Sequence, residues 1–193
     1  MAAQLQQPVR FDTSVVVFPG GVGTAEEILY LLGILLHPDN AAQPFPLILT
    51  GPRQSAEYFE RIDAFLRLAL GDAVASRYQI LVDSPQQVAR AVRKGIEQVR
   101  EYRVASQDAF FFNWGLTIDH ALQQPFAPTH EIMAALDLRL GQPPHQLAAH
   151  LRRAFSGIVA GNVKEEGLRA VEQRGPFEIR GEPSIMRALD ELL

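Results

Sequence analysis

Pro19-Gly20-Gly21-Val22-Gly23-Thr24-Ala25-Glu26-Glu27 lies between two apolar runs, Ser14–Phe18 and Ile28–Leu36. A short valine-rich run, a glycine-rich turn and a longer apolar run predict a strand, a tight turn and a helix. Glycines let the backbone turn sharply and approach a ligand, because they carry no Cβ. The free N–H groups at the start of the predicted helix favour an anion such as phosphate. We therefore expect a phosphate site made by the following residues: Gly20, Gly21, Val22, Gly23 and Thr24.

Two common nucleotide-binding patterns do not fit this turn. The phosphate loop that ends in Gly-Lys-Ser/Thr is excluded, because the stretch contains no lysine. The dinucleotide pattern G-x-G-x-x-G is excluded too, because Glu26 stands three positions after Gly23. The stretch is better described by the longer and more specific string P-G-G-x-G-T-x-x-E.

This string resembles the signature of the lonely-guy phosphoribohydrolases, which are also labelled lysine-decarboxylase-like proteins. Two further segments, Leu47–Pro52 and Leu151–Glu165, look like one bacterial branch of that family, the nucleotide 5′-monophosphate nucleosidases, often called AMP nucleosidases. The resemblance extends over nearly the whole chain from Arg10 onward. The decarboxylase label has no chemical support in the sequence, whose only lysines are Lys94 and Lys164.

The resemblance implies hydrolysis of the N-glycosidic bond of nucleoside 5′-monophosphates, which gives a free base and ribose 5-phosphate. Glu27 is then the expected catalytic carboxylate, because the reaction builds positive charge on the ribose. Members of this family use an arginine upstream of the glycine turn, and Arg10 is the candidate here. No cofactor is implied.

Thr24 and Glu27 also have a purely structural interpretation. Thr-x-x-Glu at the start of a helix is a capping box, in which the two side chains satisfy each other's backbone N–H groups. Three preceding glycines are not needed for such a cap, which favours the catalytic interpretation of Glu27. The two roles are compatible.

Composition limits the class of protein. The chain has 193 residues, 47% of them apolar, and a net charge of −4, which argues against nucleic-acid binding. It contains no cysteine, which rules out disulfides and thiol chemistry. Met1–Gln7 is polar and no apolar run approaches the length of a membrane span, so we expect a cytoplasmic protein that does not interact with membranes.

Strands alternate with helices in the first part of the chain. Strands are predicted at Ser14–Phe18, Pro46–Thr50 and Tyr78–Val82, and helices at 24–37, 55–70 and, after a Ser84 capping box, 85–103. This alternation predicts an α/β fold, part of a doubly wound, Rossmann-like parallel sheet, over residues 1–104. Ligands bind beyond the carboxyl ends of such strands, which adds Thr50 and Gly51 to the expected binding residues.

The predicted first helix has no polar face between Ile28 and Leu36. Such a helix is buried all round, either in a deep core or at a subunit interface. The family resemblance favours the interface, so we expect a homo-oligomer that forms through this helix.

Residues 105–193 are predicted to form a mainly α-helical extension. Helices are expected at 128–138, 144–158, 163–173 and 184–193, with a capping box at Asn162–Glu165 and a short strand at Pro176–Ile179. The aromatic cluster Phe110–Trp114 is either the core of a subdomain or a platform for stacking a base. The five histidines show no metal-binding spacing.

Only three strands are predicted, whereas a doubly wound nucleotide-binding sheet usually has five or more. We therefore expect the chain to be part of a longer protein.

Two other functions stay open. The same cradle could serve a non-catalytic module that binds a nucleotide or an alarmone regulator. The third is a cytokinin riboside 5′-monophosphate phosphoribohydrolase; the long carboxyl-terminal extension argues against it, because those enzymes are usually compact single domains.

Overall fold

The computed structural model describes residues 14–107, 115–124 and 126–193. Its sheet consists of three parallel strands in the order β1-β2-β3. In chain order the elements are β1 (Val15–Val17), α1 (Val22–Leu35), η1 (Pro38–Asn40), β2 (Leu47–Gly51), η2 (Arg53–Ser55), α2 (Ala56–Leu70), η3 (Asp72–Arg77), β3 (Gln79–Val82), α3 (Pro85–Ala105), α4 (His120–Gln123), α5 (His130–Ala134), α6 (Pro144–Val163), α7 (Glu165–Arg174) and α8 (Pro183–Leu192).

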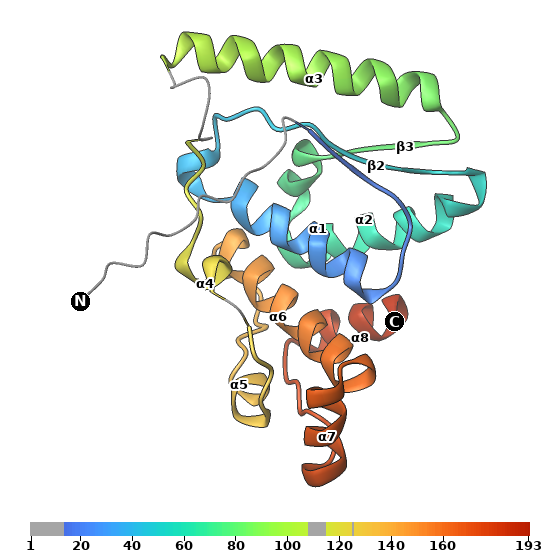
Figure 1. Ribbon diagram of the computed structural model, residues 1–193, viewed down its shortest axis with the longest axis vertical. Helices are drawn as coiled ribbons and strands as arrows, with labels where there is room; N and C mark the ends of the chain where they lie inside the picture. Colours follow the sequence, from blue (N-terminus) through green and yellow to red (C-terminus); the bar gives the residue numbers. More distant parts are fainter. Residues whose placement is uncertain (1–13, 108–114, 125) are drawn as a thin grey trace.

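The predicted α/β alternation is confirmed. Val16 pairs with Ile48, and Leu49 with Ile80, so the three strands run in register with all carboxyl ends at one edge. Helix α3 lies on one side of the sheet, and α1 and α2 lie on the other (Figure 1). This is the two-sided cover of a doubly wound sheet.

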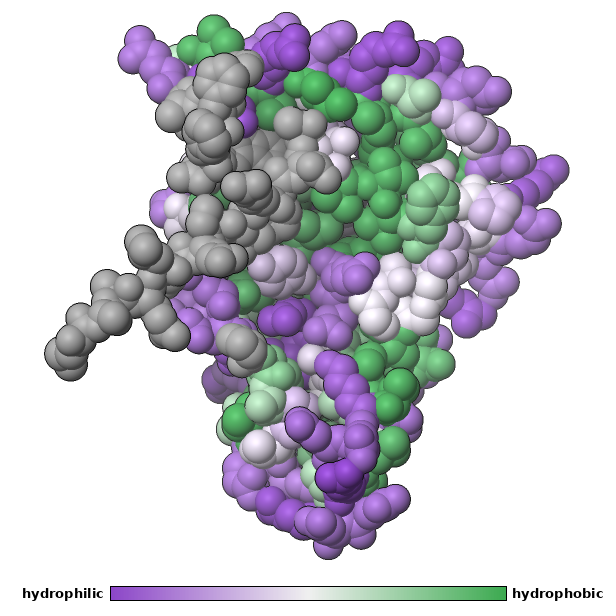
Figure 2. All heavy atoms as spheres, in the orientation of Figure 1, coloured by the Kyte–Doolittle hydropathy of each residue, from purple (hydrophilic) through white to green (hydrophobic). Residues whose placement is uncertain are grey.

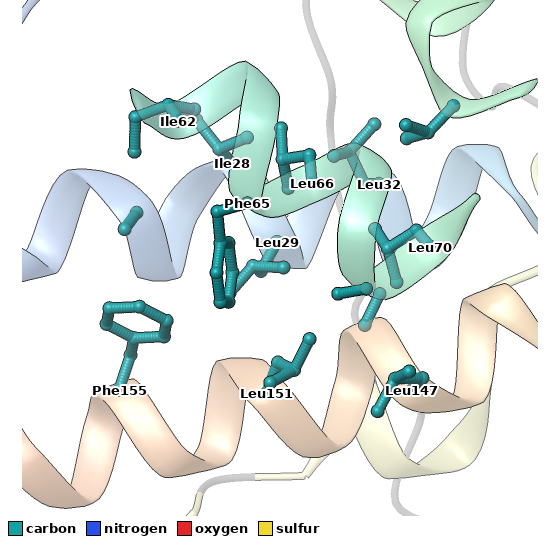
Figure 3. Close-up of a cluster of buried hydrophobic side chains, with 14 of the residues drawn as sticks. Ile28, Leu29, Leu32, Ile62, Phe65, Leu66, Leu70, Leu147, Leu151 and Phe155 are labelled. Carbon is teal, nitrogen blue, oxygen red and sulfur yellow. The ribbon is translucent and has the colours of Figure 1, made fainter. Parts of the chain in front are cut away.

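The main core lies between α1, α2 and α6. Isoleucine, leucine and phenylalanine side chains from all three helices point toward one another there (Figure 3). Phe155 of α6 is fully buried, and its ring meets that of Phe65 edge to face, with 5.9 Å between the centroids. The same cluster continues into α8 through Ile185 and Leu189.

The carboxyl-terminal extension is mainly helical, as predicted, but it does not have a core of its own among the described residues. Helix α6 packs along the length of α1, so residues on both sides of the expected boundary at 104 bury one another. A buried Asn40 adds a polar link. Its Nδ2 donates to the carbonyls of Ile34 and Thr117, both at 2.7 Å, and its Oδ1 accepts from the Thr117 N–H at 2.8 Å.

The burial of α1 is explained within this chain. Ile28, Leu29 and Leu32 are each 0–1% exposed in the main core, and Ile34, 1% exposed, packs with Leu122 of α4 and Ala149 of α6. Of the two interpretations of an all-apolar helix, the deep core is the one the structure shows. An oligomer therefore needs a different surface from the buried part of this helix.

Several local predictions were wrong. Helix α1 starts at Val22, so Thr24 lies inside the first turn and forms no cap hydrogen bond. Ser84 precedes α3 with Pro85 at its first position, as predicted, but its side chain makes no cap bond. Asn162 belongs to α6, where its Nδ2 donates to the Ile158 carbonyl, and α7 begins only at Glu165.

Two predicted segments of the extension also differ. Residues 176–179 form no strand, and the one isolated bridge recorded for the described chain joins Leu138 to Gly181. Helix α5 covers only His130–Ala134, because the chain then turns at Ala135 and enters this bridge.

Strand β1 is the edge of the described sheet. Val15 and Val16 are only half-buried and Phe18 is 63% exposed. Hydrophobic side chains gather on this face of the molecule, between α3 and α1 (Figure 2). None of the described helices is both long and apolar enough for a membrane span.

Candidate functional site

The glycine turn leaves the carboxyl end of β1 and opens at the amino end of α1. Gly21 is the residue before the helix, in an extended conformation that needs no side-chain cap, and its carbonyl accepts from the Thr24 N–H at 3.0 Å. Gly20, Gly21 and Gly23 are exposed. The start of this 14-residue helix is therefore open to solvent at Gly21 and Gly23, where backbone N–H groups can bind an anion.

Thr24 folds back over the turn instead of capping the helix. A Cβ built on Gly20 would lie only 2.1 Å from the Thr24 hydroxyl oxygen, so Gly20 leaves the space that this side chain fills. The hydroxyl therefore lies beside the backbone of the expected phosphate site. Glu27 follows one turn later and is exposed.

Tyr58 of α2 lies beneath the turn, and sequence analysis missed it. Its hydroxyl is buried and has no hydrogen-bond partner among the described residues. Burial raises the pKa of Tyr58, while the Gly20 backbone and the Thr24 side chain beside it act in the opposite direction. The signal in the sequence is weak, because a tyrosine in an amphipathic helix is ordinarily part of the core.

The end of β2 lies against the glycine turn. A Cβ on Gly51 would approach Pro19 to 2.8 Å, so only glycine permits this contact without a shift. Thr50 is buried, and its hydroxyl donates to the Leu81 carbonyl at 2.6 Å. Gly51 therefore borders the turn, whereas the Thr50 donor is used within the sheet.

A cavity of about 680 Å³ runs along the exposed side of α1. Its lining comes from β1, α1, α4, α6 and the residue after α6: Val15, Gly23, Glu26, Glu27, Tyr30, Leu31, Leu122, Arg152, Val159 and Lys164. The structure thus brings Glu27 and one residue of the glycine turn together in one cavity. A second cavity, of about 310 Å³, is lined from β2, β3 and α3 and includes no residue of the glycine turn.

Arg152 of α6 lines this cavity and forms an ion pair with one of its carboxylates, that of Glu26. Its Nε lies 3.7 Å from Glu26 Oε1, and its guanidinium carbon lies 5.1 Å from the centre of the Tyr30 ring. Burial raises the pKa of Tyr30, and the positive charge of Arg152 opposes this. Sequence analysis quoted the Leu151–Glu165 segment for its resemblance but did not select Arg152, because the fold alone places α6 beside α1.

Two sequence predictions lie outside the described residues, namely Arg10 and the aromatic cluster Phe110–Trp114. Among the residues that the structure describes, no group of three or more histidine, aspartate or glutamate side chains could hold a metal ion.

Comparisons with known proteins identify the family. Residues 96–193, just over half of the chain, match the family described as "Pyrimidine/purine nucleotide monophosphate nucleosidase, C-terminal". The chain belongs to this family. Residues 1–92 match a second one, described as "Possible lysine decarboxylase". The two matches meet within α3, and the packing joins the parts on either side.

The curated relatives carry the same name. The chain is 52% identical, over 190 residues, to proteins named pyrimidine/purine nucleotide 5′-monophosphate nucleosidase from Escherichia coli K12 and from E. coli O157:H7. The match covers 98% of this chain but 42% of each relative. The chain thus spans less than half the length of these relatives.

Proposed function

We propose that this site hydrolyses the N-glycosidic bond of nucleoside 5′-monophosphates to free base and ribose 5-phosphate. The observation that carries the proposal is the single cavity that joins Gly23 of the glycine turn to the Glu27 carboxylate. An anion-binding helix start with a carboxylate one turn away suits a phosphorylated sugar whose reacting carbon becomes positive. The names of the relatives support the same reaction.

The roles of the individual residues follow from their positions. The glycine turn and the Thr24 hydroxyl hold the 5′-phosphate, so that binding energy remote from the reacting bond positions the sugar. Glu27 orients or deprotonates the attacking water and stabilises the positive charge on the ribose. Gly51 shapes the turn through Pro19. Arg10 is the proposed assisting arginine. Thr50 would contact the substrate through its backbone or through a lone pair of its hydroxyl oxygen, because the hydroxyl hydrogen is donated to the Leu81 carbonyl.

The wider context of the reaction is also proposed. The enzyme acts in the cytoplasm, where nucleoside monophosphates are made and used, and requires no cofactor. A homo-oligomer would bury the apolar side chains along the β1 edge, where Phe18 is largely exposed.

Glu27→Gln tests the proposal. Release of ribose 5-phosphate from AMP, GMP, CMP and UMP should fall by about 10²–10⁴-fold in Glu27→Gln, the range for loss of a general acid or base. Glu97→Gln, which removes an exposed carboxylate of α3 outside the cavity, is the control and should leave this release unchanged.

The alternative functions give different results. A module that only binds a nucleotide or an alarmone would show no turnover in either form and full affinity in Glu27→Gln. A cytokinin-activating enzyme would prefer N6-substituted adenosine monophosphates. The match of residues 96–193 to the nucleosidase family favours the first function over this one.

A further inference from the structure

Positions along α1 match the order of the parts of a nucleotide. Gly23, Glu27 and Tyr30 all line the cavity and lie on one side of the helix. At about 1.5 Å per residue, Glu27 lies roughly 6 Å along the axis from Gly23, and Tyr30 roughly 10 Å. If the phosphate binds at the glycine turn, the ribose lies beside Glu27 and the base lies beside Tyr30.

Arg152 faces α1 between Glu26 and Tyr30, because it contacts both residues. Its side chain is only 17% exposed, and its Nη1 is buried without a hydrogen-bond partner among the described residues. The ion pair with Glu26 at 3.7 Å is longer than a hydrogen bond and leaves this donor unused. An unpaired donor of a buried guanidinium is costly, so an acceptor supplied by a ligand would relieve that cost.

The placement of the charge is selective. A guanidinium beside the ribose would repel the positive charge that forms on the sugar. A guanidinium beside the base would instead stabilise the negative charge that forms on the leaving base. Glu26 offsets the Arg152 charge in the free enzyme, and the Tyr30 ring supports the guanidinium from its face.

We propose that Arg152 is the leaving-group residue of this site, because its guanidinium donates to an acceptor atom of the nucleotide base. The inference rests on the proposed nucleosidase function. Water adds to C1′ as the C1′–N bond breaks, and the electron pair of that bond stays on the base. Glu27 takes one proton from the water, and one proton returns to the base, so the products are neutral base and ribose 5-phosphate. Arg152 stabilises the base before that proton arrives.

The test compares leaving groups. Arg152→Ala and Arg152→Lys are assayed with AMP and UMP, and with ribose 5-phosphate that carries p-nitrophenoxide at C1′. Arg152→Ala should lower kcat for the nucleotides by about 10²–10³-fold, the range for removing one donor to developing negative charge. For p-nitrophenoxide, which leaves without such help, the loss should stay below about threefold. Arg152→Lys should recover part of the nucleotide activity, because it keeps the charge.

Arg153→Ala is the matched control. This neighbouring arginine also has a buried nitrogen without a partner among the described residues, its Nε, but it donates to the Ala121 carbonyl at 3.3 Å, lies over the Phe126 ring and does not line the cavity. It should lower activity with both classes of substrate to the same small extent.

Equal losses with both leaving groups in Arg152→Ala would show a structural role and overturn the inference. A second readout separates it from the proposed function. Affinity for AMP should fall at least tenfold in Arg152→Ala while affinity for ribose 5-phosphate stays unchanged, and equal changes in both affinities would again overturn it. No release of base from any nucleotide, by the unsubstituted chain or by a version with the expected preceding residues, would instead refute the nucleosidase function.

Discussion

Phe155→Ala should destabilise the whole chain rather than its carboxyl-terminal part alone. The Phe155 side chain is fully buried between α1 and α2, and its ring contacts that of Phe65. Removing a buried phenylalanine costs about 3–5 kcal/mol through lost transfer energy and the cavity that remains. A chain of 193 residues has an unfolding entropy of about 0.4 kcal/mol/K. The substitution should therefore lower Tm by about 7–12 °C.

The assay is thermal unfolding followed by far-ultraviolet circular dichroism, together with amide hydrogen exchange in β2. Exchange of the Ile48 and Leu49 amides should accelerate along with that of α6, because both elements share one core. Leu168→Ala on α7, where the side chain is 39% exposed, is the control and should change Tm little. Faster exchange in α6 with unchanged exchange in β2 would refute the shared core and show that residues 105–193 unfold separately.

Three further perturbations test other contacts. Arg174 bonds Glu131 at 2.7 Å and lowers the pKa of Glu131 from 4.5 to about 2. The pair therefore stabilises the fold fully above pH 4.5 and loses this effect as the pH falls toward 2. Glu131→Gln should flatten the pH dependence of stability between pH 4.5 and 2, measured by urea unfolding at a series of pH values. Asn40→Ala removes three hydrogen bonds between the Asn40 side chain and the backbone of Ile34 and Thr117. It should cost about 2–4 kcal/mol by urea titration, and a loss below 1 kcal/mol would contradict the link. Gly51→Ala forces Pro19 to move and should weaken ribose 5-phosphate binding in calorimetry, whereas unchanged affinity would separate β2 from the phosphate site.

Periodic apolar patterns carried most of the fold prediction. All three strands and the long helices were predicted from the sequence, because each has apolar residues in a continuous run or at a regular spacing along one face. The caps failed at Thr24, Ser84 and Asn162. A capping box is a local pattern of two side chains, but packing against other elements decides where a helix begins, and it extended α1 by two residues and α6 through Val163.

The site residues that are close in sequence could be predicted, whereas those that come from distant helices could not. Glu27 and the glycine turn lie within one turn of each other in sequence. Tyr58 and Arg152 come from α2 and α6, and an arginine in an amphipathic helix carries no mark of the cavity that it will face. Only the packing of α6 along α1 shows this relation.

Under the proposed function, that packing also gives the extension a role in the chemistry. If residues 105–193 served only to stabilise the fold, apolar contacts such as those of Leu147, Leu151 and Phe155 would be sufficient. Placing Arg152 next to the buried Leu151 on α6 costs free energy, because its Nη1 is desolvated and unpaired among the described residues. Arg153 has a buried unpaired nitrogen too, but only Arg152 lines the cavity, so a ligand in that cavity can pair with it. The same helix that completes the core therefore also supplies the end of the cavity where the base is expected, and loss of its packing should reduce base-dependent binding before phosphate binding.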